Sequence, residues 1–420
     1  MMNPPRTNSV PDQEYVWLIL IIATGLALRA VAIVAFNHIP ESDELAYQSM
    51  ALNLVHGNGI ADGIADGMGN RAMYNVGYPL FVLAPVFALF GENVLFARVA
   101  NALLGGLAIV LCYAAAKEAG AGKVGRLLAT TLWALYLPAS IFAVFLLKEN
   151  LMIPLMLGVI WCALRLLKAP SYRTALACGA LFGLLALTGN AALPLAAPAA
   201  FAILFTPASV QRKLSLSVLV LISAMLVAAP WMARNFQLLG APVLNTNGGF
   251  NLYLGNNPAA TGMFVSISDT PRGPTWEALR KEGELRASDT LKREAMEWIK
   301  ANPSTFLELA VKKAAFFWTP PIHQGKKQSS GAEPVVRILW AIQFFVLVAG
   351  AVGGLVFASL RNRNMMVLWL AIASYTAVHM LFYVTSRYRE AIMPVLCLLA
   401  AFGFAYLADC LKAKAITSKR

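Results

Sequence analysis

The chain has 420 residues, of which 59% are hydrophobic and 13% are charged. Soluble domains contain about 25% charged residues, so this composition excludes an ordinary water-exposed protein. The net charge is +13. In a chain this apolar, the surplus of Lys and Arg is typical of short cytoplasmic loops that fix membrane topology, and we expect no nucleic-acid partner.

Long apolar runs recur along the whole chain. Each is about 20 residues long, the length that crosses about 30 Å of hydrocarbon. They predict an all-α polytopic membrane protein, a bundle of about ten transmembrane helices. The expected helices fall at residues 15–36, 95–117, 127–147, 150–168, 174–189, 191–208, 214–232, 334–359, 365–384 and 390–410.

The distribution of basic residues gives the expected orientation. Lys and Arg are concentrated in alternate short loops and in the C-terminal tail, and basic loops face the cytoplasm. Both termini are then expected to be cytoplasmic. No small-residue cleavage site follows the first apolar run, so we expect that run to be retained as a helix rather than removed as a signal peptide.

Two longer segments interrupt this pattern, and both fall on the extracytoplasmic side. They are the first loop, residues 37–94, and a polar stretch at 233–333. They divide the chain into an N-terminal transmembrane module at 1–232, the long loop, and C-terminal helices with a tail at 334–420. Loops of this length are usually functional.

Both loops contain patterned segments. In the long loop, residues 275–300 have helical spacing, and residues 305–318 predict a helix lying in the membrane interface. Residues 240–262 are rich in Asn and Gly, which predicts turns. In the first loop, residues 79–90 are apolar but too short to span a membrane. We therefore expect extracytoplasmic juxtamembrane helices beside the bundle.

A pair of acids opens a helical segment in the first loop. Ser42 is the expected N-cap, and Asp43 and Glu44 follow it in the first turn. Tyr47 lies four residues after Asp43, on the same helical face. The helix dipole alone favours acids in a first turn, whereas a carboxylate near the membrane surface can also act as a general base. The residues by themselves leave both interpretations open.

Four separated segments resemble the GT-C glycosyltransferases. The nearer likeness is to the family 39 type, which includes the protein O-mannosyltransferases and the aminoarabinose transferases of lipid A. The segments occur in the same order as in that family and on the same side of the membrane. They are residues 42–59 with 77–81 and 90–91, residues 230–235 with Gly240, residues 247–258, and residues 386–390 with Pro394.

The resemblance implies a sugar donor carried on a polyprenyl phosphate and an acceptor that is a glycan, a lipid or a protein. It implies inverting transfer at the extracytoplasmic face of a bacterial inner membrane, with membrane lipids around the enzyme. The acid at the matching position is Asp43, which would act as the base on the acceptor, with Glu44 beside it.

A further acid, Glu149, stands beside Lys148 at the expected outer end of the third membrane helix. The resemblance implies that this acid faces the first loop and helps to position the acceptor or Asp43. The alternative is a loop acid paired with Lys148. Possible contacts to substrate are Tyr47, Arg71, Tyr78, Arg98 and Lys148.

The departing polyprenyl phosphate needs cations, because its negative charge grows as the sugar leaves. Arginine suits phosphate since its planar fork binds two oxygens. Arg387 and Arg389 are expected to bind the donor phosphate, with Arg234 next, and this assignment rests mainly on the resemblance. The alternative for Arg387 and Arg389 is that they cap the preceding helix.

We expect no cofactor and no metal ion. The five cysteines lie in or beside apolar runs without a CxxC pair, and the four histidines lack ligand spacing. Asp62 and Asp66 are near the first-loop acids in sequence, but residues 59–69 have the glycine-rich pattern of a turn-rich loop.

Other classes of membrane protein are alternatives that share part of this sequence pattern. A transporter or lipid-sugar flippase also has many helices, but no repeat of the first half appears in the second. An oligosaccharide ligase or polymerase has a long outer loop and arginines, yet it needs no acidic pair after the first helix. A scaffold protein would keep the fold without the activity.

Overall fold

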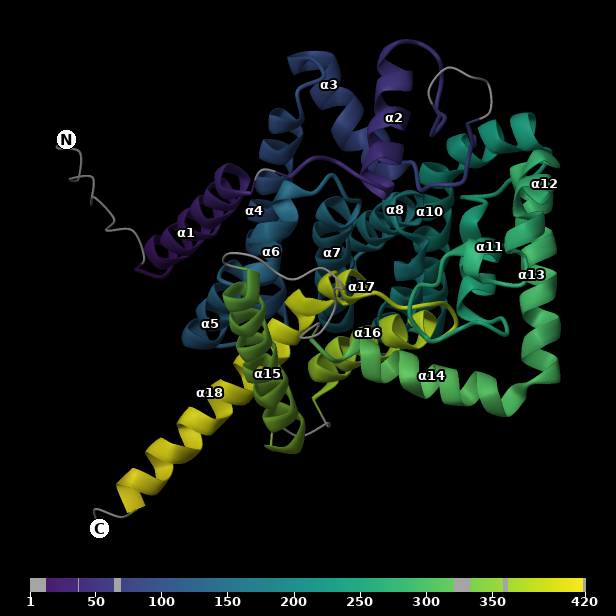
Figure 1. Ribbon diagram of the computed structural model, residues 1–420. Helices are drawn as coiled ribbons and strands as arrows, with labels where there is room; N and C mark the ends of the chain where they lie inside the picture. Colours follow the sequence, from purple (N-terminus) through teal and green to yellow (C-terminus); the bar gives the residue numbers. More distant parts are fainter. Residues whose placement is uncertain (1–12, 37, 64–68, 321–332, 358–361, 418–420) are drawn as a thin grey trace, which may run out of the picture.

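The computed structural model describes residues 13–36, 38–63, 69–320, 333–357 and 362–417. These residues form a bundle of helices (Figure 1). Within them, the β-structure is limited to an isolated bridge between Met263 and Val384. The predicted all-α class is confirmed.

Six helices of the described ranges are long and apolar enough to cross a membrane. Each reaches the length that about 30 Å of hydrocarbon requires. The chain is therefore a multi-pass membrane protein. The six helices are α1 (Gln13–Ala35), α4 (Val94–Glu118), α7 (Glu149–Lys168), α10 (Val210–Leu239), α15 (Glu333–Phe357) and α18 (Met393–Thr417).

The prediction of one continuous helix at 127–147 is wrong. α5 (Lys123–Ala134) gives way to α6 (Leu137–Ile141) and a 3-10 turn, with a bend of 55° between the two parts. Pro138 lies in the first turn of α6. Because proline has no backbone N–H, it cannot bond to the carbonyl of Ala134 four residues earlier, and the helix breaks there.

Gln343 of α15 occupies this break. Its side-chain amide donates to the carbonyl of Leu135 at 2.9 Å, and its side-chain oxygen accepts from the N–H of Leu137 at 2.9 Å. One side chain thereby satisfies backbone groups on both sides of the interruption. Counted as one span, the bent pair brings the possible spans of the described chain to seven.

Three further expected spans are shorter helices. They are α8 (Tyr172–Thr188), the 3-10 helix η3 (Asn190–Leu195) continued by α9 (Ala196–Phe205), and α16 (Arg363–His379). Helices of at most 17 residues fall short of the usual spanning length of about 20. The described ranges thus hold six or seven spans by length and composition, and the total of about ten stays a prediction.

α7 is the central helix of the bundle (Figure 1). Its most apolar stretch is 83% buried within the protein, because α4, α8, α9 and α16 pack around it. A helix enclosed in this way is a rigid support. Glu149 stands at its first position and is therefore held at a fixed point.

The long loop folds as helices against the bundle. α12 (Trp276–Lys281) and α13 (Glu284–Ala301) occupy the expected helical segment, and α14 (Pro303–Phe317) follows them. The helices predicted at 275–300 and 305–318 are confirmed. Figure 1 shows α13 along the right edge of the protein and α14 across its lower right. The expected domain boundary after residue 232 falls inside α10, and the division into domains stays a prediction.

The prediction of turns at 240–262 is wrong over α11 (Asn247–Gly255). Asn and Gly are poor helix formers, but tertiary contacts here depend on glycine. A Cβ on Gly249 would lie 1.8 Å from a backbone oxygen of α13, and a Cβ on Gly255 would lie 2.5 Å from the carbonyl carbon of Phe382. Glycine therefore lets α11 pack between α13 and the loop after α16.

Candidate active site

The first loop places Asp43 at the first position of α2 (Asp43–Val55). The preceding residue, Ser42, has a φ of 53°, in the left-handed region. Ser42 occupies the N-cap position of α2, as predicted, but its side chain makes no capping hydrogen bond. An L-residue in such a conformation costs about 1–3 kcal/mol. This strained residue sets the direction in which the chain enters α2.

Arg387 contacts two acids from distant parts of the chain. It lies on α17 (Ser386–Glu390), and its guanidinium donates a hydrogen bond to Asp43. Its Nε lies 3.8 Å from Oε1 of Glu149. Burial alone would lower the pKa of Arg387, but the charges of Glu149 and Asp43 raise it well above its ordinary value. We call these three residues the acid–arginine cluster.

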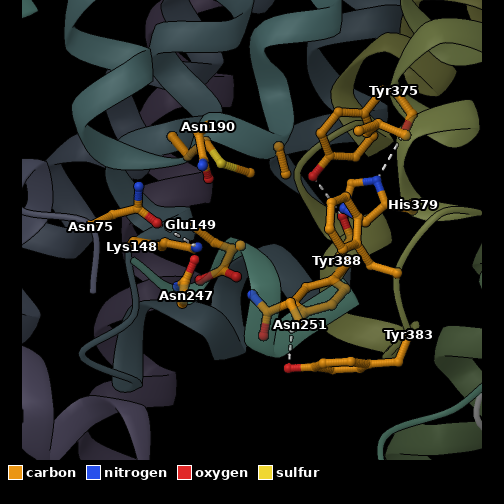
Figure 2. Close-up of a pocket in the computed structure, with 15 residues that line it drawn as sticks. Asn75, Lys148, Glu149, Asn190, Asn247, Asn251, Tyr375, His379, Tyr383 and Tyr388 are labelled. Carbon is orange, nitrogen blue, oxygen red and sulfur yellow. Dashed lines mark hydrogen bonds between the residues drawn. The ribbon is translucent and has the colours of Figure 1, made fainter. Parts of the chain in front are cut away.

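A cavity of about 160 Å³ lies beside the acid–arginine cluster. Figure 2 shows residues that line this cavity. Glu149 belongs to both, because it lines the cavity and also faces Arg387. Amides and aromatic rings make up most of the remaining polar wall. These wall residues are Asn75, Lys148, Asn190, Asn247, Asn251, Tyr375, His379, Tyr383 and Tyr388.

Helical spacing brings several wall residues to one face. Asn247 and Asn251 are four residues apart on α11, so both point into the cavity from the same side. Gly255 continues that face and allows α11 to approach the opposite wall. On α16, Tyr375 and His379 are likewise four residues apart. The cavity is thus walled by segments that lie far apart in the sequence.

Lys148 is the cation of the cavity wall. Its Nζ donates to Oδ1 of Asn75 at 3.3 Å, as the dashed line in Figure 2 marks. Burial lowers the pKa of Lys148, and the charge of the adjacent Glu149 opposes that shift. The structure therefore pairs Lys148 with Asn75 and brings Glu149 to Arg387, in place of the Lys148–Glu149 pair that the sequence left open.

Glu44 has a different place from Asp43. Its side chain is buried, accepts from the N–H of Leu146 at 2.7 Å and lies 2.5 Å from Nε2 of His38. These contacts tie the first loop to the segment before α7. Glu44 thus positions Asp43 and is not a wall residue of the cavity.

Tyr47 and Tyr78 are buried beside the acids and do not line the cavity. The ring of Tyr47 packs edge-on against Tyr74 and Tyr78, with centroids 5.8 and 5.9 Å away. Burial, together with the charge of Asp43, raises the pKa of Tyr47 well above its ordinary value. Tyr78 donates to Asn101 at 2.8 Å. The structure therefore places both as supports of the site.

Arg389 points away from Arg387, because residues two apart on a helix lie on opposite sides. It is fully buried and donates to the carbonyls of Phe317 at 2.9 Å and Thr319 at 3.0 Å. It also lies 3.3 Å from Glu390. The structure does not bring Arg389 to the cavity but binds it between α17 and the end of α14. These contacts favour the role of an anchor, and the phosphate role stays a prediction.

The other arginines expected at the site also bind backbone carbonyls. Arg234 on α10 donates to the carbonyl of Arg71 at 2.8 Å. Arg98 on α4 donates to the carbonyl of Val144 at 2.8 Å. Neither these arginines nor Arg71 line the cavity. They bind the first loop and the segment before α7, and the expected phosphate role of Arg234 stays a prediction.

The amide side chains of the cavity wall were not predicted from the sequence as site residues. Three of them, Asn75, Asn190 and Asn247, stand within two residues of a glycine, where Asn is common for conformational reasons alone. Asn251 follows Asn247 by four residues, a spacing with meaning only on a helix. Since turns were predicted there, no local signal set these residues apart.

No group of three or more His, Cys, Asp or Glu side chains in the described part of the chain is placed to hold a metal ion. Asp62 accepts hydrogen bonds from the backbone of Asn70 at 2.6 Å and from its side chain at 2.8 Å. Asp66 lies outside the described residues. The absence of a metal or cofactor requirement stays a prediction.

A family model described as dolichyl-phosphate-mannose-protein mannosyltransferase matches residues 78–233. The matched segment contains Lys148 and Glu149, whereas Asp43 and Arg387 lie outside it. No curated protein matches the chain in sequence.

Solved structures share the architecture. The archaeal oligosaccharyltransferase AglB from Archaeoglobus fulgidus, in complex with an inhibitory peptide and a dolichol-phosphate, has a TM-score of 0.57 at 14% identity, covering 97% of this chain and 52% of that one. The apo form of the Archaeoglobus fulgidus enzyme has a TM-score of 0.57 at 15% identity, covering 96% and 52%. The chain spans about half the length of the archaeal enzyme. Its fold is that of the GT-C superfamily, as the resemblance implied.

Proposed function

We propose that this chain is a membrane glycosyltransferase that moves a sugar from a polyprenyl phosphate to an acceptor on the extracytoplasmic face. The observation that carries the proposal is the acid–arginine cluster beside a polar cavity. It combines a carboxylate that can take a proton with a cation that can stabilise a leaving phosphate. The GT-C fold and the family match over residues 78–233 support this reaction class.

In the proposed reaction, Asp43 takes the proton of an acceptor hydroxyl as the acceptor oxygen attacks the anomeric carbon. The bond between that carbon and the phosphate oxygen breaks, and its electron pair stays on the polyprenyl phosphate. Attack opposite the leaving group inverts the anomeric centre. A general base of this kind contributes about 10²–10⁴-fold to the rate.

Two cations are near enough to the cavity to stabilise the leaving phosphate. Arg387 offers a planar fork that fits two phosphate oxygens, and Lys148 offers a point charge on the cavity wall. Arg387 is engaged by Asp43 before substrate binds. A phosphate that draws Arg387 toward itself would leave Asp43 free to accept the proton, so donor binding and base activation would be linked.

The proposed location follows from the segments that build the cavity. The first loop, the long loop and the loop before α18 all contribute to the site. The distribution of Lys and Arg supports a position of these loops opposite the cytoplasm. The proposed setting is a bacterial inner membrane with both termini cytoplasmic. The donor is a hexosyl or pentosyl polyprenyl phosphate, and the acceptor is a glycan, a lipid or a protein.

Binding of undecaprenyl phosphate to the detergent-purified protein tests the proposal. The wild type should bind it saturably, and Arg387→Ala and Lys148→Ala should each weaken binding roughly 10- to 100-fold, the range for a lost hydrogen bond to a charged group. Arg165→Ala is the matched control, because Arg165 is a largely exposed cation in the last turn of the same helix that begins with Glu149.

Two outcomes would contradict the proposal. One is the absence of saturable binding by the wild type, which would turn attention to substrate flux across a vesicle membrane. The other is an equal loss of affinity in Arg165→Ala, since that would mean that any cation of the chain attracts the lipid.

A further inference from the structure

Two buried polar atoms of the cavity wall have no hydrogen-bond partner within the described chain. They are Nδ2 of Asn75, which is a donor, and Oε2 of Glu149, which is an acceptor. Their residues are only 2% and 1% exposed, and both line the cavity. Figure 2 shows them on the same side of it.

Buried polar groups are nearly always hydrogen-bonded, and one left alone lowers stability. The other atom of each group is engaged. Oδ1 of Asn75 accepts from Lys148, and Oε1 of Glu149 lies 3.8 Å from Arg387. Each side chain is therefore held in place by one atom and offers the other to the cavity, an arrangement suited to an incoming ligand.

The chemistry of the two free atoms selects the ligand. A hydroxyl group both donates and accepts, so neighbouring hydroxyls can accept from Nδ2 of Asn75 and donate to Oε2 of Glu149. A phosphate has acceptors only and would be repelled by Glu149. Asn190, Asn247 and Asn251 add amides that donate and accept around the same space.

We propose that this cavity is the subsite for the sugar of the donor, and that Asn75 and Glu149 select a non-acidic, hydroxyl-bearing ring. The inference rests on the proposed glycosyltransferase function and adds the class of sugar to it. Glu149 would act as a filter, because the carboxylate of an acidic sugar would lie beside a carboxylate that is already present. The cations Lys148 and Arg387 serve the phosphate.

The test compares lipids that differ only in the sugar. Affinity of the wild type is measured for bare undecaprenyl phosphate and for undecaprenyl phosphate carrying glucose, galactose, mannose or glucuronic acid. We expect at least one neutral-sugar lipid to bind roughly 10- to 30-fold more tightly than the bare lipid, the gain from two ordinary hydrogen bonds. The glucuronic acid lipid should show no gain.

Variants of Asn75 and Glu149 test whether these two residues cause the preference for neutral-sugar lipids. Glu149→Gln keeps the shape of the side chain but replaces the charged acceptor by an amide. It should reduce the preference to less than about threefold, measured against the affinity of the same variant for the bare lipid. Asn75→Ala should have the same effect on the preference. Asn75→Leu, which has nearly the same size and adds no charge, provides a second variant without the donor if the alanine variant does not fold.

Asn245→Ala is the matched control. The amide nitrogen of Asn245 also lacks a hydrogen-bond partner in the described chain, but this residue is not part of the cavity wall. Its replacement should leave the preference for neutral-sugar lipids unchanged.

The outcomes separate the two proposals. If the bare lipid binds saturably but no neutral-sugar lipid gains affinity, or the glucuronic acid lipid binds most tightly, the sugar subsite is overturned and the glycosyltransferase proposal stands. Retention of the full preference in Asn75→Ala and Glu149→Gln would also overturn it. If even the bare lipid fails to bind, both proposals fall.

Discussion

The guanidinium of Arg387 hydrogen-bonds the carboxylate of Asp43 across 344 positions of the sequence. The contact joins the first loop to the loop before the last helix, next to the first residue of the central helix. In the unliganded protein, the acid is therefore paired with the cation. In the proposed reaction, the two groups separate before Asp43 takes a proton and Arg387 binds phosphate.

Replacing the acid should separate catalysis from donor binding. We expect Asp43→Asn to lower kcat about 10²–10⁴-fold, because an amide cannot accept the acceptor proton, while undecaprenyl phosphate still binds. Turnover is measured as consumption of lipid-linked sugar in proteoliposomes supplied with a membrane extract as acceptor. Wild-type turnover in a folded Asp43→Asn preparation would remove Asp43 as the base.

Replacing the arginine should affect both the donor and the fold. Arg387→Ala leaves Asp43 and Glu149 facing each other without a cation, so we expect lower thermal stability as well as a raised donor KM. The double variant Arg387→Ala with Asp43→Asn should recover part of the lost stability but none of the donor affinity. A double variant no more stable than the single one would show that the pair contributes nothing to folding.

The neighbouring arginine should behave in the opposite way. Arg389 is fully buried and bound to two carbonyls at the end of α14, so Arg389→Ala should cost about 3–5 kcal/mol of unfolding free energy. In the protein that remains folded, we expect unchanged affinity for undecaprenyl phosphate. Thermal unfolding and lipid binding are measured on the same preparation. A stable variant that loses lipid binding would return Arg389 to the phosphate site.

The strained backbone before Asp43 gives a stability prediction. Ser42→Gly should raise the free energy of unfolding by about 1 kcal/mol, since glycine adopts a φ of 53° without strain. Ser42→Val should lower it, because a β-branched residue tolerates positive φ poorly. Denaturant titrations of the two variants beside the wild type measure the difference. Equal stability of all three would mean that Ser42 carries no strain.

Stability should depend on pH through Lys313 of α14. This buried amine donates to Asn256 and to the carbonyl of Met380, and burial lowers its pKa from 10.5 to about 8. Between these two values the unfolded chain binds more protons, so the contribution of Lys313 to stability should rise as the pH increases. The melting temperature of the wild type, measured relative to that of Lys313→Met, should therefore increase between pH 8 and pH 10. A constant difference over that range would contradict the lowered pKa.

The charged members of the site were predictable because charges are scarce in a membrane chain and costly to bury. Asp43, Glu149 and Arg387 each interrupt or border an apolar run, and the resemblance supplied their order. The scarcity of charges does not show that Arg387 belongs to the site and Arg389 does not. The two residues have the same flanking pattern, and only the packing of α17 determines which one faces the acids and which one the interior.

Local patterns were least informative where tertiary contacts override propensity. α11 forms from a segment rich in Asn and Gly because glycine permits close packing on both of its sides. Pro138 is a sequence signal for the break after α5. The surrounding apolar run is long enough to span a membrane, so one continuous helix was predicted instead. The cavity depends on the first of these features, since α11 supplies Asn247 and Asn251 to its wall.

The bend between α5 and α6 also constrains the order in which the protein is assembled. Gln343 is synthesised 208 residues after Leu135 and 206 after Leu137, the two residues whose backbone groups it satisfies. A chain emerges from its N-terminus, so the backbone groups at this break lack the partner that they have in the folded protein until α15 is synthesised, and unpaired backbone groups are costly within a membrane. The N-terminal half is therefore not a finished folding unit, and its completion waits for the helix that follows the long loop.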